Sequence, residues 1–250
     1  MRAPGERRRR GILEPTIFTL VGIAILCGLG IWQLDRKVWK ENLVAAMNAR
    51  LTQAPADLPP RDAWPQLSAD HDEFTRVAFP AEVIEGQEAL VYTAGSALRD
   101  DVKGPGYWVF APARLAGGSV VIVNRGFVPL DRKEPASRPG GATQGSVDLV
   151  GVMRWPESRG MFTPADDVTH NVWYLRDIKA IATAKSWSAP APFYIDEEQP
   201  APPGGLPSPG KLTVHLPDNH LQYAITWFGL ALALAGVYVV YIARRLARHG

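Results

Sequence analysis

Cysteine is almost absent from this chain of 250 residues, because Cys27 is the only one. A single cysteine cannot form a disulfide within the chain. It also excludes the CxC and CxxC pairs that bind copper and the CxxCH sequence that attaches haem covalently. Cys27 stands inside a long apolar stretch. We interpret it there as a small residue that faces lipid or packs against another helix, in preference to a redox group.

Motifs of the common enzyme classes are missing as well. The sequence has no GxSxG elbow, no HExxH helix and no Gly-rich phosphate loop, and Gly104-Pro105-Gly106 predicts a tight turn instead. Two clusters contain residue types that bind metals, His71-Asp72-Glu73 and Asp166-Asp167 with His170. Both lie in polar segments, so solvated surface is the favoured interpretation. We therefore expect no enzyme, with a convergent site that lacks a motif as the alternative.

Charge is absent from two long runs. Residues 17–34 contain no charged side chain, and residues 223–243 contain no ionisable one except tyrosine. About 20 residues, at a rise of about 1.5 Å each, cross the hydrocarbon core of a bilayer. The runs predict transmembrane helices over residues 16–35 and 220–243. A signal peptide is the alternative for the first run, but the run is long and no A-x-A cleavage site follows it.

Arginine is concentrated in the two tails, residues 1–15 and 244–250, which hold eight of the 27 basic residues and only two of the 25 acidic ones. Basic tails resist translocation, so both termini are predicted to be cytoplasmic. Residues 36–219 then lie outside, in the periplasm if this is the inner membrane of a bacterium. The acidic balance of this middle region argues against nucleic acid as its partner. Aromatic residues flank the predicted spans as interfacial belts do: Trp32, Trp39, Tyr223, Trp227, Tyr238 and Tyr241.

Proline and glycine are frequent between residues 54 and 210, which suits strands and turns. Short strand-like runs are predicted at residues 74–84, 90–93, 107–110, 119–124, 147–153, 172–175, 193–195 and 212–214. The predicted fold is a membrane protein in which two transmembrane α-helices flank an extracytoplasmic α+β domain, mainly an antiparallel sheet or small barrel. Helical spacing continues over residues 36–51, a short helix is expected at 177–185, and Pro-rich linkers are expected at 54–72 and 198–211.

The start of the second apolar run is the first candidate site. Asp218 or Asn219 can cap the helix there. His220, Tyr223 and Trp227 follow at i, i+3 and i+7, so they share one face of the helix. A histidine at this boundary could bind a ligand, or it could be a polar interface residue with no ligand, and the pattern alone does not decide between the two.

Four segments, taken in order, resemble the surfeit locus family of cytochrome c oxidase assembly factors. They are Gly30 to Arg36 with Trp39-Lys40, Gly104 to Tyr107, Val121 to Pro129, and His220 to Phe228. Each string alone is weak, but the four follow the family's order across nearly the whole chain. The resemblance implies a non-catalytic helper that promotes maturation of the oxidase catalytic subunit by binding or guiding haem a. It implies that subunit, the haem a synthase and membrane lipid as partners; the alternative is a structural chaperone that binds no cofactor.

A haem site needs an imidazole for iron, aromatic or small residues for the faces, and cations for the propionates. With the resemblance, the candidate cofactor residues are His220, as the iron ligand, with Tyr223, Trp227, Trp32, Arg36 and Lys40. Gly22, Gly28 and Gly30 would permit close approach of the two helices. Arg36 and Lys40 could equally bind lipid phosphates, and the aromatic residues could be simple membrane anchors.

Asn124-Arg125-Gly126 follows the apolar run Val120 to Val123. We expect a turn here, in which Gly126 takes a positive φ and Pro129 stops further pairing. Arg125 could brace the turn through Asp148 or Asp177, which we favour, or it could face the client oxidase. Together with Gly106 and Tyr107, these residues form the candidate client or structural motif.

Overall fold

The computed structural model describes residues 4–143, 145–188, 190–214 and 218–248, with side chains in the first helix from Ile12 onward. It divides into two compact units. One consists of Met1–Ala45 with Leu216–Gly250, and the other of Ala46–His215. Leu216 and Pro217, which precede the second predicted span, lie outside the described residues.

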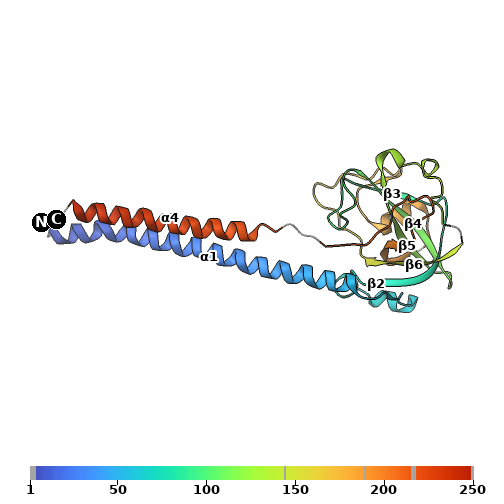
Figure 1. Cartoon of the computed structure of the whole chain (residues 1–250), viewed down its shortest axis with the longest axis horizontal. Coiled ribbons are helices and arrows are strands. Elements are labelled where there is room, and N and C mark those ends of the chain that lie inside the picture. Colours follow the sequence, from blue (N-terminus) through green and yellow to red (C-terminus); the bar gives the residue numbers. More distant parts are fainter. Residues whose placement is uncertain (1–3, 144, 189, 215–217, 249–250) are drawn as a thin grey trace. The chain divides into compact units, whose positions relative to one another are not determined.

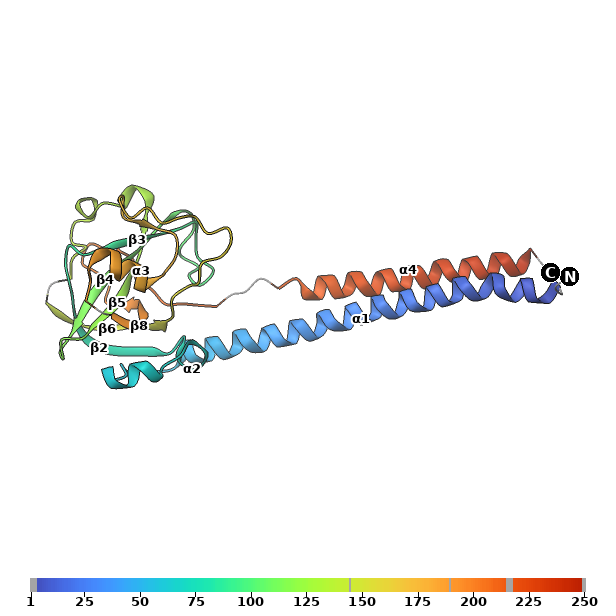
Figure 2. The same ribbon diagram turned by 180° about the vertical axis from the view of Figure 1, so that it is seen from behind.

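Two long helices make up the first unit. Helix α1 spans Pro4–Thr52 and α4 spans His220–Ala247; they lie side by side and antiparallel (Figures 1 and 2). Both are long and apolar enough to cross a membrane. Most of their large apolar side chains are exposed, as expected where lipid rather than protein surrounds a helix. The helix predicted over residues 36–51 is confirmed as a continuation of α1, which ends at Thr52 before Pro55.

Small residues bring α1 and α4 together. Ala224 is only 1% exposed. A Cβ atom on Gly30 would lie 2.6 Å from the ring of Phe228, and one on Gly22 would lie 2.9 Å from Leu234. The expectation of close approach is therefore confirmed at these two glycines. It is wrong for Gly28, whose added Cβ would meet no atom within 4 Å.

The second unit is built on a closed sheet. The strands are β1 (Ala56–Asp57), β2 (Arg76–Val83), β3 (Ala89–Thr93), β4 (Gly106–Leu115), β5 (Val120–Pro129), β6 (Ser146–Arg154), β7 (Val172–Trp173) and β8 (Pro190–Gln199). Their order is β1-β2-β6-β8-β5-β4-β3-β7. A further pairing of β2 with β4 closes β2, β6, β8, β5 and β4 into a ring. The predicted small, mainly antiparallel barrel is thus confirmed, with β5 and β8 paired parallel.

The predicted strands are confirmed except for residues 212–214, which form none. The linker predicted at 54–72 is also wrong, because it holds β1, the 3-10 helix η1 (Arg61–Gln66) and the short helix α2 (Ala69–Asp72). Trp64 in η1 is buried against Phe193, with ring centroids 5.7 Å apart. The Pro-rich linker predicted at 198–211 overlaps β8 at its start and is hydrogen-bonded to the barrel farther along. Ser208 pairs with Phe127, and the Gly210 N–H donates to Glu197 O at 3.1 Å.

Alternating side chains divide most of the core of this unit between two clusters, beside a smaller one of Leu90, Val109 and Val128. Phe193 and Ile195 point into the barrel with Val121, Val123 and Met153. Tyr194, between them in β8, points the other way, as the two-residue period of a strand requires. Helix α3 (Ile178–Lys185), seen beside β8 in Figure 2, covers that second side with Ile178 and Ile181. The short helix expected from Asp177 is confirmed, with the Asp177 carboxylate accepting from Ala180 N–H.

Candidate functional site

His220 is the first residue of α4 and is held at two points. Asn219 stands at the cap position but makes no side-chain cap bond, whereas Asp218 Oδ1 accepts from the His220 backbone N–H at 2.8 Å. In the imidazole ring, Nδ1 lies 2.6 Å from Oε1 of Gln33 in α1. An amide oxygen can only accept, so Nδ1 is the donor, and in the neutral ring the lone pair then lies on Nε2. In the described part of the chain Nε2 has no hydrogen-bond partner.

Sequence reasoning missed Gln33. Its signal was an amide side chain near the end of an otherwise apolar run, since an amide at the edge of the hydrocarbon region needs a partner. The partner could not be read from the sequence. The pairing of α1 with α4 brings together residues 187 positions apart.

The aromatic candidates near His220 lie in different environments. Tyr223 and Trp32 are 54% and 53% exposed. Trp227 is half-buried, and its indole N–H is buried without a hydrogen-bond partner among the described residues. Of these three, Trp227 is the one whose unpaired donor is buried within the described structure. Tyr223 and Trp32 present their rings outward, as interfacial anchors do.

The two cationic candidates lie farther along α1. The Arg36 guanidinium stands over the ring of Trp39, 4.3 Å from its centroid. Lys40, one turn later, is half-buried. A guanidinium stacked on an aromatic face keeps its N–H groups available to an anion at the ring edge. The arrangement therefore suits either a lipid phosphate or the carboxylate of a ligand.

The second candidate motif lies in the barrel and differs from expectation. Asn124, Arg125 and Gly126 do not form a turn but continue β5. Trp108 pairs with Phe127 and Phe110 with Asn124, so β5 holds one extra residue there, as in a β-bulge. The positive φ predicted for Gly126 is confirmed at +118°, and a Cβ atom there would lie 2.1 Å from Ser208 O.

Arg125 is buried, and its partners are not those expected. Its guanidinium donates to Gly141 O at 3.2 Å and to Thr143 Oγ1 at 2.5 Å, and its Nε lies 3.7 Å from Glu197 Oε2. The proposed braces to Asp148 and Asp177 are therefore wrong. The reason is the parallel pairing of β5 with β8, which places Glu197 next to Arg125. Burial raises the pKa of Glu197 to about 7, and the charge of Arg125 opposes this only in part.

Asn124 ties three strands together. Its amide donates to Asp196 Oδ1 at 2.6 Å, and its carbonyl oxygen accepts from Gly126 N–H at 3.2 Å. Arg154 of β6 approaches the other oxygen of Asp196 at 3.2 Å. All these groups are buried, so each needs the others as hydrogen-bond partners. The network holds β5, β6 and β8 together through side-chain hydrogen bonds, so we interpret it as structural.

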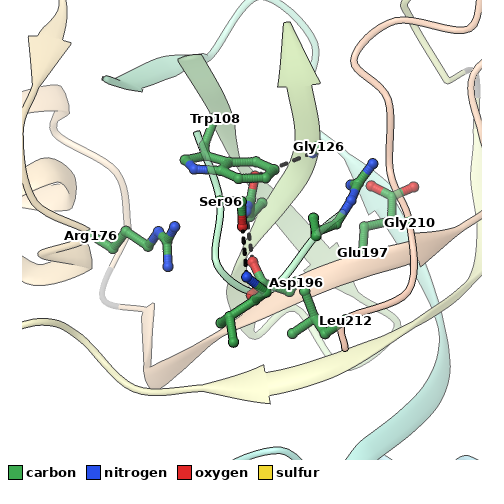
Figure 3. Close-up of a pocket in the computed structure, with 11 residues that line it drawn as sticks. Ser96, Trp108, Gly126, Arg176, Asp196, Glu197, Gly210 and Leu212 are labelled. Atoms are coloured by element: carbon green, nitrogen blue, oxygen red, sulfur yellow. Dashed lines mark hydrogen bonds between the residues drawn. The ribbon is translucent and has the colours of Figure 1, made fainter. Parts of the chain in front are cut away.

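A small cavity adjoins this network (Figure 3). Trp108, Arg176, Asp196 and Glu197 are among the residues that line it, and its volume is about 10 Å³. That is room for roughly one water molecule. This cavity is too small for an organic cofactor, so it is not the cofactor site.

Gly106 and Tyr107 begin β4, after a bend in which Gly104 has φ +101°. The tight turn predicted here is centred on Gly104, and Gly106 has a packing role. A Cβ atom on Gly106 would lie 2.4 Å from the Phe127 ring and from Val128 O. The Tyr107 ring meets that of Tyr92 edge to face at 6.0 Å, and burial raises the Tyr107 pKa.

The acidic clusters serve local contacts. Asp72 accepts from the Ser68 backbone N–H at 2.8 Å, and Glu73 pairs with Arg154 at 3.0 Å. Asp166 pairs with Arg159, and Asp167 with His170. Over the described ranges, no group of three or more His, Cys, Asp or Glu side chains could hold a metal ion.

Comparison with known proteins identifies the family. Residues 20–232 match the model of the SURF1 family. A SURF1-like protein of Monosiga brevicollis is 36% identical over 222 residues, which cover 85% of this chain and 81% of that protein. Surfeit locus protein 1 of Homo sapiens is 32% identical over 223 residues, 82% of this chain and 70% of the human protein. This chain therefore belongs to the SURF1 family.

Proposed function

We propose that this protein is an assembly factor for a haem–copper cytochrome c oxidase, and that it assists maturation of the catalytic subunit by binding or guiding haem a. The observation that carries the proposal is the contact between His220 and Gln33. It leaves the Nε2 lone pair of an interfacial imidazole without a partner in the described residues. A neutral imidazole nitrogen in this state is able to bind the iron of a haem.

The residues around His220 fit the needs of a haem. Haem supplies an iron that takes an axial nitrogen, a flat apolar ring and two carboxylates. Among the described residues, His220 would offer the nitrogen, Trp227 an apolar ring and an indole N–H without a hydrogen-bond partner, and Arg36 a cation stacked on Trp39. Lys40 is a second cation on the same helix, and Trp32 and Tyr223 supply further aromatic surface.

The proposed setting is the inner membrane of a bacterium. Two apolar helices support membrane anchoring. Basic tails favour cytoplasmic termini, which would place the barrel in the periplasm. We propose as partners the catalytic subunit, the haem a synthase that supplies the cofactor, and membrane lipid; no role in catalysis is assigned to the chain.

An absorption spectrum tests the haem proposal. The full chain is made in cells that synthesise haem a and purified in detergent. We expect a Soret band that His220→Ala abolishes or shifts. His170→Ala is the matched control, because His170 is exposed and pairs with Asp167, and it should leave the band unchanged. A preparation without haem, or a band insensitive to His220→Ala, contradicts the proposal.

A specific observation supports the alternative of a structural chaperone that binds no cofactor. Met161 and Phe162 are 92% and 93% exposed, although both are large and apolar. They stand on a turn in which Thr163 N–H donates to Gly160 O at 3.2 Å and Arg159 pairs with Asp166. A braced turn that presents two apolar side chains is typical of a protein contact.

The chaperone alternative makes the opposite prediction. Replacing Met161 and Phe162 with serine should reduce co-purification of the oxidase subunit and lower oxidase activity. His220→Ala should leave both unchanged. If the turn variant co-purifies like the wild type, this alternative loses its support.

A further inference from the structure

We propose that Gln33 is the positioning residue of the His220 site. It fixes the tautomer and orientation of the imidazole, so that the Nε2 lone pair is presented for a metal. The inference rests on the proposed function and deepens it, since it assigns a role to a residue of the other helix.

The direction of one hydrogen bond carries the argument. Oε1 of Gln33 lies 2.6 Å from Nδ1 of His220, and a carbonyl oxygen has no proton to give. Nδ1 must therefore donate, and a neutral ring with its proton on Nδ1 has its lone pair on Nε2. Histidine ligands of metals commonly donate their second ring nitrogen in this way, which fixes the ring and makes the ligand more basic.

The surrounding helices make the contact a fixed one. Gly30, one turn before Gln33, lies against the ring of Phe228, and Ala224, one turn after His220, is almost fully buried. Because the helices are antiparallel and α4 begins at His220, both contacts lie on the same side of the Gln33–His220 pair, and the helix axes are close immediately next to it. Asp218 holds the backbone N–H of His220 at the same time. The imidazole is thus held through its backbone by one residue and through its ring by another.

A packing role alone would explain a glutamine and a histidine that meet between two apolar helices. The two explanations differ in what they require of the acceptor. Packing needs shape and any polar pairing, whereas positioning needs an oxygen acceptor opposite Nδ1. Leucine at position 33 keeps the volume and loses the acceptor. Glutamate keeps the length and the acceptor.

The tautomer of His220 is measurable without any cofactor. The full chain is labelled with ¹⁵N-histidine, placed in lipid nanodiscs without haem, and studied by NMR at a pH where the ring is neutral; the signal is assigned by its loss in His220→Ala. We expect the Nδ1–H form in the wild type and in Gln33→Glu. In Gln33→Leu the ratio of Nδ1–H to Nε2–H should fall about fivefold or more, the factor for a hydrogen bond of about 1 kcal/mol.

Gln222→Leu is the matched control, because Gln222 is an exposed glutamine two residues from His220 on α4. It should leave the tautomer ratio unchanged. A wild-type ring with its proton on Nε2, or a ratio that Gln33→Leu does not alter, overturns the inference.

A second readout separates this inference from the proposed function. In protein loaded with haem a, the iron–histidine stretching frequency of the ferrous state should rise in Gln33→Glu and fall in Gln33→Leu. If no variant binds haem while the NMR pattern holds, the proposed function fails and the orienting role of Gln33 stands. If haem binds through His220 but the frequency is the same in all variants, the inference fails and the proposed function stands.

Discussion

At the scale of single residues, Glu197 and Arg125 lie next to each other in the interior but form no hydrogen bond. Their Nε and Oε2 atoms are 3.7 Å apart, and both side chains are at most 5% exposed. At this distance the attraction does not compensate the carboxylate for its lost hydration. The pKa of Glu197 is therefore raised, to about 7. The neighbouring carboxylates differ, because Asp196 accepts a hydrogen bond from Asn124 and Glu73 accepts one from Arg154.

The raised pKa predicts how stability depends on pH. A glutamate in the unfolded chain has a pKa of about 4.3, so between about pH 4.3 and 7 the folded state binds a proton that the unfolded state has lost. The contribution of Glu197 to the free energy of unfolding therefore falls as pH rises through this window, by up to roughly 4 kcal/mol. Urea unfolding of the full chain in detergent at several pH values measures it.

Glu197→Gln isolates this contribution, because other carboxylates also titrate. As the pH rises from 5 to 8, the free energy of unfolding of the wild type should fall relative to that of Glu197→Gln. Glu82→Gln is the control, since the Glu82 side chain is more than half exposed, and it should keep the wild-type slope. The same slope in Glu197→Gln would show that the group is already ionised at pH 5.

Gly126 permits the bulge of β5 and the approach of Ser208. Alanine at this position would have to adopt φ +118° with its Cβ atom 2.1 Å from a backbone oxygen. We expect Gly126→Ala to destabilise the barrel by about 2–4 kcal/mol, from backbone strain and displacement of the 208 segment. The denaturation midpoint measures the effect. Gly117→Ala, whose Cβ would meet no atom within 4 Å, should cost less than about 1 kcal/mol.

At the scale of elements, the sequence predicts strands well where apolar residues alternate or cluster. The sequence predicts strands poorly where their pairing depends on residues that are far apart in the chain. Residues 212–214 have the composition of a strand, but their backbone is bound elsewhere. Val214 exchanges two hydrogen bonds with the side chain of Asn48, and Thr213 N–H donates to Leu98 O. The closure of the barrel through β2 and β4 has the same origin, since no local pattern encodes which edges meet.

The candidate site shows the same division. His220 and its position at a helix start are readable from the sequence, because an apolar run and capping residues mark them. The partner Gln33 is not readable, because the register of two helices decides it. The sequence predicts Arg125 as a brace, but its partners depend on the parallel pairing of β5 and β8, which the expectation of a mainly antiparallel sheet or small barrel does not specify.

The packing of α1 on α4 is testable through its glycines. Gly30→Ala places a methyl group 2.6 Å from the Phe228 ring, whereas Gly28→Ala meets no atom within 4 Å. The first change should push the helices apart and lower the thermal stability of the full chain in detergent, at a cost of about 1–2 kcal/mol in helix association. The second should leave it unchanged or raise it, because alanine favours the helix. Equal effects of the two changes would contradict the register.

At the scale of the whole molecule, the function depends on which side of the membrane each part occupies. The exposed apolar side chains of α1 and α4 support membrane anchoring. The eight arginines of the two tails favour the cytoplasmic side for both termini. His220 begins α4 at the end opposite the basic C-terminal tail, so the topology that we propose would put it at the outer boundary of the bilayer.

Single-cysteine labelling tests this topology, because Cys27→Ala leaves a chain without cysteine. In that background Phe162→Cys puts a thiol at a position that is 93% exposed, and Arg248→Cys puts one in the C-terminal tail. A membrane-impermeant maleimide should label position 162 in spheroplasts and position 248 only in inverted vesicles. The mass of the mature chain, measured by mass spectrometry, should show that α1 has not been removed. The reverse labelling would put His220 at the cytoplasmic boundary of the bilayer. Loss of α1 would remove Gln33. Either result would contradict the proposed periplasmic role of the His220 site in binding or guiding haem a.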